Sequence, residues 1–161
     1  MNDPHSILIV NGPNLRHLGQ RQPEIYGREG MDALPSLLDS LLGSRIALVS
    51  LSFFQTNEEG ALLDRLEQAR TEGIHGVVLN AGAYTHTSLA LADCLAWIDL
   101  PVVEVHISNI LARPEPLRRQ SLIGPHVIGL IAGFGLLGYA LAVQALLEHA
   151  ASLSSSSSRI P

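Results

Sequence analysis

The sequence lacks lysine altogether, so all ten of its basic residues are arginine. This absence excludes a lysine Schiff base, a lysine that binds pyridoxal phosphate and a phosphate loop of the Walker type, because each needs the lysine amine. With one cysteine, Cys94, the chain can form neither an internal disulfide nor a metal cluster held by cysteines. Any chemistry must therefore use arginine, histidine, tyrosine, carboxylate, hydroxyl or backbone groups.

Charged residues are also scarce. They make up 16% of the 161 residues, against a usual share of about 25%, whereas hydrophobic residues make up 47%. So few charges cannot cover the surface of a domain of this size, which indicates that part of the surface is buried against other copies of the chain. The net charge of −5 offers no basic surface for nucleic acid or for an acidic membrane.

Long apolar runs are missing as well. No run approaches the roughly 20 apolar residues that span a membrane. Residues 1–10 lack the basic segment and the long apolar segment of a signal peptide. We therefore expect a cytoplasmic protein that has neither a membrane nor a nucleic acid as a partner.

Short β-branched runs alternate with longer amphipathic segments along the chain. Five runs predict buried strands, at 6–12, 45–53, 76–82, 101–108 and 126–133. The segments between and after them predict helices near 31–42, 58–72, 87–97 and 135–150. This alternation indicates an α/β protein with right-handed crossovers and a parallel sheet. We expect a three-layer, flavodoxin-like fold, in which a five-stranded sheet of order 2-1-3-4-5 carries helices on both faces.

The chain shows no internal repeat and no linker, so we expect residues 1–150 to form a single domain. Residues 151–161 are rich in serine and low in complexity, which predicts a disordered tail.

The segment GFGLLG, residues 133–138, matches the G-x-G-x-x-G pattern of dinucleotide-binding sites and follows a predicted strand. That fingerprint, however, opens a strand–helix–strand unit with an acidic residue about 20 residues further on. Here only one helix and the serine-rich tail follow, so close packing of the last helix on the sheet is the favoured explanation.

Polar side chains follow several of the predicted strands, at the edge where ligands bind in folds of this kind. Glu104 and His106 lie two residues apart on one strand, so their side chains share a face. A carboxylate can orient an imidazole and hold its proton, and a buried charge without a partner costs several kcal/mol. On these grounds alone the pair fits a site as well as a structural role, whereas His86 by itself is more typical of a cap or turn.

Residues 19–27, GQRQPEIYG, are bounded by glycines and carry Arg21 and Tyr26. Such a loop can form a lid that closes over a reaction. A surface turn with an exposed tyrosine is the simpler explanation of this segment taken alone.

Four segments in order resemble the type II 3-dehydroquinate dehydratases: ILIVNGPNL with LGQRQPEIYG, then FFQTNEEGALLDRL, VLNAGAYTHTSLALAD and PVVEVHISN. The resemblance extends from about residue 6 to residue 148. It implies the flavodoxin-like fold, a dodecamer built of trimers, and the dehydration of 3-dehydroquinate to 3-dehydroshikimate through an enolate, with neither metal nor cofactor.

The resemblance also assigns roles to matching positions. Tyr26 corresponds to the proton acceptor and Arg21 to the lid arginine that activates it. His106 corresponds to the general acid and Glu104 to its orienting partner. Asn14 matches the residue associated with the water that stabilises the enolate.

The implied substrate contacts are Asn80, His86, Ile107, Ser108 and Arg118, the amides of Ile107 and Ser108 cradling the carboxylate. Asp93 corresponds to a residue that reaches into the active site of a neighbouring subunit.

The sequence departs from the family pattern in two places near the predicted site. Arg16 and His17 replace an asparagine and an apolar residue in the first loop, where two bulky polar side chains would affect lid closure or substrate affinity. The segment that holds Arg118 is one residue longer than usual. Alignment on Ser121 places Arg118 at the substrate position, whereas alignment on His106 places Leu117 there.

Two other interpretations stay open: an inactive, oligomeric member of the family, and a non-catalytic flavodoxin-like binding module. The loop after the first strand lacks the phosphate cradle rich in serine and threonine that flavodoxins use. The acidic pair and lysine of a receiver domain are also missing. Both absences speak against the binding module.

Overall fold

The computed structural model describes residues 4–20 and 30–157. Its centre is a five-stranded sheet formed by β1 (His5–Asn11), β2 (Val49–Gln55), β3 (Gly76–Asn80), β4 (Val102–His106) and β5 (Gly129–Ala132). All neighbouring strands are parallel, and their order is β2-β1-β3-β4-β5. The predicted fold class, a flavodoxin-like sheet of order 2-1-3-4-5, is therefore confirmed.

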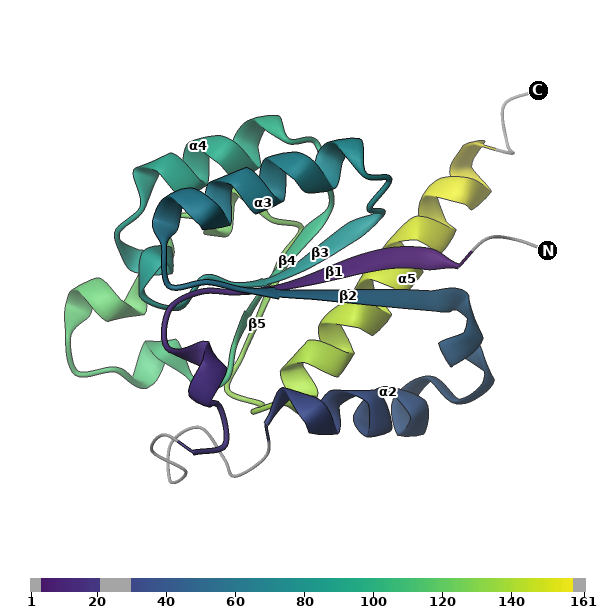
Figure 1. The fold of residues 1–161 in the computed structure, drawn as a ribbon, viewed down its shortest axis with the longest axis horizontal. Coiled ribbons are helices and arrows are strands. Elements are labelled where there is room, and N and C mark those ends of the chain that lie inside the picture. Colours follow the sequence, from purple (N-terminus) through teal and green to yellow (C-terminus); the bar gives the residue numbers. More distant parts are fainter. Residues whose placement is uncertain (1–3, 21–29, 158–161) are drawn as a thin grey trace.

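Helices cover both faces of this sheet (Figure 1). One face carries α2 (Leu34–Leu42) and α5 (Leu137–Ser157), and the other carries α3 (Glu59–Thr71) and α4 (Leu89–Trp97). Side chains alternate along β1, so Ile7 and Ile9 join the core against α2 and α5, whereas Leu8 and Val10 join the core against α3 and α4. Burial on both faces explains why the three inner strands β1, β3 and β4 consist of nearly continuous apolar runs.

Local signals explain where the helices begin. Pro35 lies in the first turn of α2, where a missing N–H costs no hydrogen bond within the helix. At the start of α4, the Ser88 hydroxyl accepts a hydrogen bond of 2.8 Å from the Leu91 N–H. Ser88 is the last residue of the THTS segment, whose hydroxyl groups suit a helix start.

Two boundaries differ most from the prediction. Strand β2 begins at Val49, because α2 ends at Leu42, its cap residue Gly43 has a φ of 53°, and a 3-10 turn over Gly43–Leu48 comes before the strand. Helix α5 continues to Ser157 and so includes part of the serine-rich segment expected to be disordered. There the hydroxyls of Ser152 and Ser154 donate to backbone carbonyls of the preceding turn, which lets serine remain in a helix.

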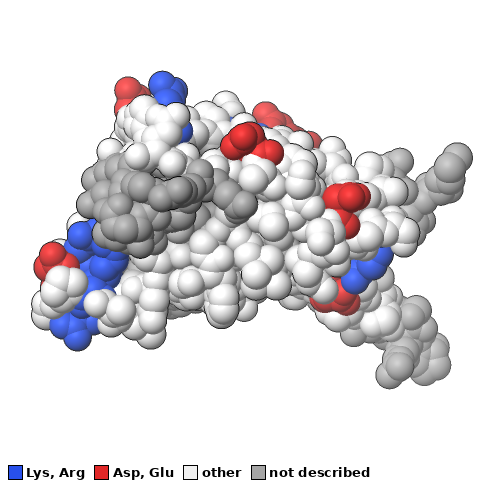
Figure 2. Space-filling model, turned by 90° about the horizontal axis from the view of Figure 1, so that it is seen from below, with Lys and Arg blue, Asp and Glu red and all other residues white. Residues whose placement is uncertain are grey.

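Large parts of the surface carry no charge, as Figure 2 shows for the view from below. The blue atoms in that view all belong to arginine, because the chain has no lysine. The exposed apolar side chains include Phe53, Leu130 and Phe134, and Leu130 lies on the edge strand β5. Among the described helices, none has the length and apolar character needed to cross a bilayer.

The carboxyl ends of the strands meet at one edge of the sheet, on the left of Figure 1. Short 3-10 turns gather there: Leu15–His17 after β1, Gly82–His86 after β3, and Ile110–Ala112 and Pro116–Arg119 after β4. The fold therefore places the loops of three adjacent strands around one point.

Candidate active site

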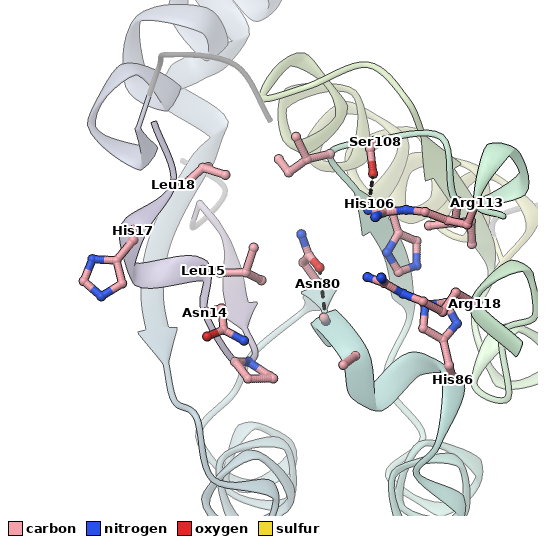
Figure 3. A pocket seen from close by; sticks show the side chains of 15 residues that line it. Asn14, Leu15, His17, Leu18, Asn80, His86, His106, Ser108, Arg113 and Arg118 are labelled. Atoms are coloured by element: carbon pink, nitrogen blue, oxygen red, sulfur yellow. Dashed lines mark hydrogen bonds between the residues drawn. The ribbon is translucent and has the colours of Figure 1, made fainter. Parts of the chain in front are cut away.

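A pocket lies at this edge, between the loops that follow β1, β3 and β4 (Figure 3). Its walls come from segments far apart in sequence, including Asn14 from the first loop, Asn80 from the end of β3 and His106 from the end of β4. None of its described lining residues is an aspartate or a glutamate, whereas Arg113 and Arg118 both contribute to the lining. The pocket is therefore suited to a small anion.

The Glu104 carboxylate and the His106 imidazole form a buried pair beside the pocket. Oε1 of Glu104 lies 2.6 Å from Nε2 of His106, and both side chains are buried. An ionised carboxylate can only accept, so Nε2–H donates, and Nδ1 is the ring nitrogen left for a substrate. The predicted sharing of one strand face is confirmed, and Glu104 orients the imidazole.

Ser121 completes the surroundings of Glu104. Its hydroxyl lies 3.0 Å and 2.8 Å from the two carboxylate oxygens, to which it donates, and it accepts a hydrogen bond of 2.8 Å from the Gly124 N–H. Glu104 is completely buried, so these donors are what makes its negative charge tolerable there. No local sequence pattern predicts this contact, because Ser121 lies 17 residues after Glu104 in an irregular segment.

His86 lies beside His106 in the pocket wall. Its Nδ1 is 2.6 Å from the Gln120 carbonyl oxygen, and because a carbonyl only accepts, Nδ1 carries a hydrogen and Nε2 is left for a ligand. The rings of His86 and His106 stack with an interplanar angle of 15° and centroids 6.2 Å apart. Two imidazoles with fixed orientations therefore lie side by side (Figure 3).

The two arginines reach the pocket from the segment after β4. Arg113 donates from Nη2 to the Ser108 hydroxyl at 2.7 Å, which ties the predicted substrate contact Ser108 to a cation. Arg118 lines the pocket from its turn, and Figure 3 shows its side chain near that of His86. Leu117, the alternative from alignment, is 58% exposed and is not part of the lining. The geometry therefore favours Arg118 for the substrate position.

The loop that carries Asn14 is fastened to the end of β2. Asn14 has a φ of 68°, a left-handed conformation that asparagine tolerates better than most residues. Its N–H donates to Oδ1 of Asn57 at 3.0 Å, and Nε2 of Gln55 donates to Asn57 Oδ1 and to the Gly12 carbonyl, at 3.2 Å each. These contacts hold Asn14 in the pocket wall.

The remaining predicted residues divide into three groups. Asn80, Ile107 and Ser108 line the pocket. Asp93 is exposed on α4 and does not line the pocket of its own chain. Arg21 and Tyr26 lie outside the described residues.

The glycine-rich segment after β5 has the structural role that the sequence favoured. Gly133 and Gly135 adopt positive φ angles of 95° and 58° where the chain turns into α5. A Cβ on Gly138 would lie 3.5 Å from the Val105 side chain and 3.6 Å from that of Ile131, so helix and sheet are in contact there. Within the described part of the chain, no three His, Cys, Asp or Glu side chains cluster to hold a metal ion.

Comparison with known proteins places the sequence and the fold of this chain in one family. The model of the family described as dehydroquinase class II matches residues 5–147. A 3-dehydroquinate dehydratase of Ruegeria pomeroyi is 50% identical over 145 residues, covering 89% of this chain and 94% of that protein. A protein of Botryotinia fuckeliana named catabolic 3-dehydroquinase is 47% identical over 138 residues, covering 86% of this chain and 89% of that protein.

Solved structures agree with the sequence comparison. The type II dehydroquinase of Butyrivibrio crossotus superposes with a TM-score of 0.80 at 40% identity, over 89% of this chain and 97% of that one. The type II dehydroquinase of Propionibacterium acnes gives a TM-score of 0.79, also at 40% identity, over 91% and 98% of the two chains. The chain therefore belongs to the dehydroquinase class II family.

Proposed function

We propose that this protein is a dehydratase that converts 3-dehydroquinate to 3-dehydroshikimate and water, by anti elimination through an enolate and without a cofactor. The observation that carries the proposal is the buried Glu104–His106 pair beside a pocket with two arginines and no acidic lining, in a member of this family. The substrate is a carboxylate, which suits such a pocket.

His106 is the general acid in this mechanism. Elimination must protonate the departing hydroxyl group, and a positioned acid contributes typically 10²- to 10⁴-fold to such a step. Glu104 stabilises the imidazolium form and fixes the ring, while Ser121 keeps the carboxylate in place. The free Nδ1 of His106 is the atom from which the proton leaves.

Tyr26 is the proposed base and Arg21 its activator, because the GQRQPEIYG segment resembles the lid segment of the type II dehydratases. Free tyrosine has a pKa of about 10 and is a poor base at neutral pH. A guanidinium within a few ångströms favours the tyrosinate, and each pKa unit gained corresponds to about 1.4 kcal/mol. The lid that carries both residues would exclude water from the enolate.

The substrate is held by groups from three loops. The amides of Ile107 and Ser108 cradle the carboxylate, and Arg118 adds positive charge. Asn80 and His86 are further substrate contacts, and Asn14 is associated with the water that stabilises the enolate. The backbone amides, Arg118 and the Asn80 amide are donors in place before the reaction, and donors already in place stabilise developing charge most.

The proposal includes a cytoplasmic homo-oligomer, a dodecamer built of trimers, in which each chain contributes residues 1–150 as one domain. Asp93 would reach a neighbouring active site, in keeping with its exposed position on α4. The scarcity of charge and the exposed apolar side chains support such burial between copies. Dehydration of 3-dehydroquinate serves both biosynthesis and catabolism; one relative is named a catabolic 3-dehydroquinase, and another is named 3-dehydroquinate dehydratase.

Near-ultraviolet absorbance tests the proposal, since 3-dehydroshikimate contains a conjugated enone and 3-dehydroquinate does not. The protein should produce a steady rise in absorbance, and Tyr26→Phe and His106→Ala should each abolish it while the fold survives. A Tyr26→Phe variant with near-normal activity would rule out the proposed base. A folded but inactive wild type would favour the scaffold interpretation, and a yellow purified protein would favour a flavin-binding module.

A further inference from the structure

Two asparagines end adjacent strands of the sheet directly beneath the pocket. Asn11 is the last residue of β1 and Asn80 the last of β3, and the two are partners in the register of these strands. Their side chains continue the face of Ile9 and Val78, which is the face covered by α5. Both are buried, so their amide groups need partners within the protein.

Tyr139 of α5 supplies that partner to both residues. Its side chain is completely buried, with its hydroxyl 2.9 Å from Nδ2 of Asn80 and 2.7 Å from Oδ1 of Asn11. A single hydroxyl thus joins two strand ends that are 69 residues apart in the sequence and lie against the same helix.

The direction of each hydrogen bond follows from a backbone group. The Gly82 N–H can only donate, and it lies 3.2 Å from Oδ1 of Asn80, so Nδ2 of Asn80 faces Tyr139. The tyrosine oxygen therefore accepts from Asn80, and its one hydrogen goes to Asn11. Burial raises the pKa of Tyr139 well above its ordinary value, with the hydrogen bond from Asn80 acting in the opposite direction, so the hydroxyl keeps that hydrogen.

Among the three hydrogen-bonded residues Asn11, Tyr139 and Asn80, it is Asn80 that lines the pocket. It lines the pocket between the loop of Asn14 and the side chains of His106 and Arg118 (Figure 3). Tyr139 uses one hydrogen of Nδ2 and Gly82 binds Oδ1, which leaves the second amide hydrogen to donate to a ligand. An asparagine held at both ends of its amide cannot rotate to present oxygen in place of nitrogen.

We infer that Tyr139 is a positioning residue, whose buried hydroxyl holds the Asn80 amide in the single orientation that donates a hydrogen bond to the substrate. This inference rests on the proposed function, because it takes Asn80 as a contact of 3-dehydroquinate. Tyr139 itself does not line the pocket, so it acts only through Asn80.

Kinetics of Tyr139→Phe in two backgrounds test the inference. In the wild-type background kcat/KM should fall about 10-fold or more, mainly through a higher KM, because a displaced substrate contact weakens binding. In an Asn80→Ala background the same change should alter kcat/KM by less than about 2-fold, because residues that act as a unit are not additive. Asn11 binds the same Tyr139 hydroxyl, so the effect of Asn11→Ala on kcat/KM should depend on the background in the same way.

Val143→Ala is the matched control, because Val143 is a fully buried residue of the same helix and has no polar group. It should loosen the packing of α5 and leave KM within about 2-fold of the wild type. Equal losses for Tyr139→Phe in both backgrounds, no loss in either, or the same rise of KM in Val143→Ala would overturn the inference.

Crystal structures of the wild type and of Tyr139→Phe give a readout that does not depend on turnover. The Asn80 amide should leave its position, losing the contact with the Gly82 N–H, and an unchanged Asn80 would overturn the inference. If the wild type shows no turnover of 3-dehydroquinate, the proposed function fails, and the position of Asn80 still decides whether Tyr139 holds it.

Discussion

The hydroxyl of the half-buried Ser121 lies within 3.0 Å of both carboxylate oxygens of Glu104, whose side chain is completely buried. The same hydroxyl accepts a hydrogen bond from the Gly124 N–H, so the backbone fixes the position of the serine. Glu104 in turn binds His106. The orientation of the proposed acid thus depends on a residue that does not line the pocket.

Ser121→Ala removes this donor from the buried carboxylate. A hydrogen bond to a charged group is worth about 1.5–3 kcal/mol, so kcat should fall about 10-fold or more, while KM changes little because the substrate contacts remain. Steady-state kinetics measure both constants. Ser40→Ala, at an exposed position of α2, should leave both unchanged. A rise in KM alone, with kcat preserved, would contradict this role for Ser121.

Arg118→Ala and Leu117→Ala together test which of these two residues occupies the substrate position in the segment that is one residue longer than usual. Because Arg118 lines the pocket and Leu117 does not, the arginine variant should raise KM about 10- to 100-fold. The leucine variant should leave KM within about 2-fold of the wild type, because its side chain is exposed. The reverse pattern would mean that the turn is placed differently when substrate is bound.

Gly12→Ala should destabilise the protein severely. A Cβ at residue 12 would lie 2.5 Å from the Ala81 carbonyl oxygen, a backbone atom that cannot move without disturbing the end of β3. The expected loss is at least about 2 kcal/mol in the free energy of unfolding. Gly60→Ala is the control, because nothing lies within 4 Å there and a helical alanine should add about 0.5 kcal/mol. Urea unfolding at one protein concentration measures both, and similar midpoints for the two variants would refute the close approach.

Cys94 should make stability depend on pH in the alkaline range. Burial, with a smaller contribution from the charge of Glu67, raises the pKa of the thiol from its ordinary 9.0 to about 11. The thiol of the unfolded chain ionises first, so the stability contributed by Cys94 is complete below pH 9 and is lost as the pH rises toward 11. The urea midpoint of the wild type should therefore drop more between pH 8.5 and pH 10 than that of Cys94→Ala. Parallel curves for the two proteins would remove Cys94 as the cause.

The sequence predicted the sheet well because β1, β3 and β4 are short apolar runs rich in β-branched residues and are buried on both faces. It placed the start of β2 too early, because Ile46 and Leu48 continue the apolar pattern into the 3-10 turn before Val49. The serine-rich segment looked disordered by composition, whereas a helix already packed on the sheet continues through Ser157.

Site residues were predictable where one strand carried them together. Glu104 and His106 share a face by simple alternation, and their contact follows from that. Ser121 and Tyr139 were missed for different reasons: the serine approaches from an irregular segment, and the tyrosine lies in a helix where an aromatic residue looks like ordinary core. Such partners depend on how separate segments pack, which the local sequence pattern does not contain.

The most direct test of the proposed function mixes the purified protein with 3-dehydroquinate and follows near-ultraviolet absorbance, for untreated protein and for protein first treated with 3-dehydroquinate and borohydride and then freed of both. A chain without lysine has no lysine amine to form the imine that borohydride traps, so the account predicts the same rise in absorbance in both samples. No rise from a folded protein, or a rise that borohydride abolishes, would contradict it.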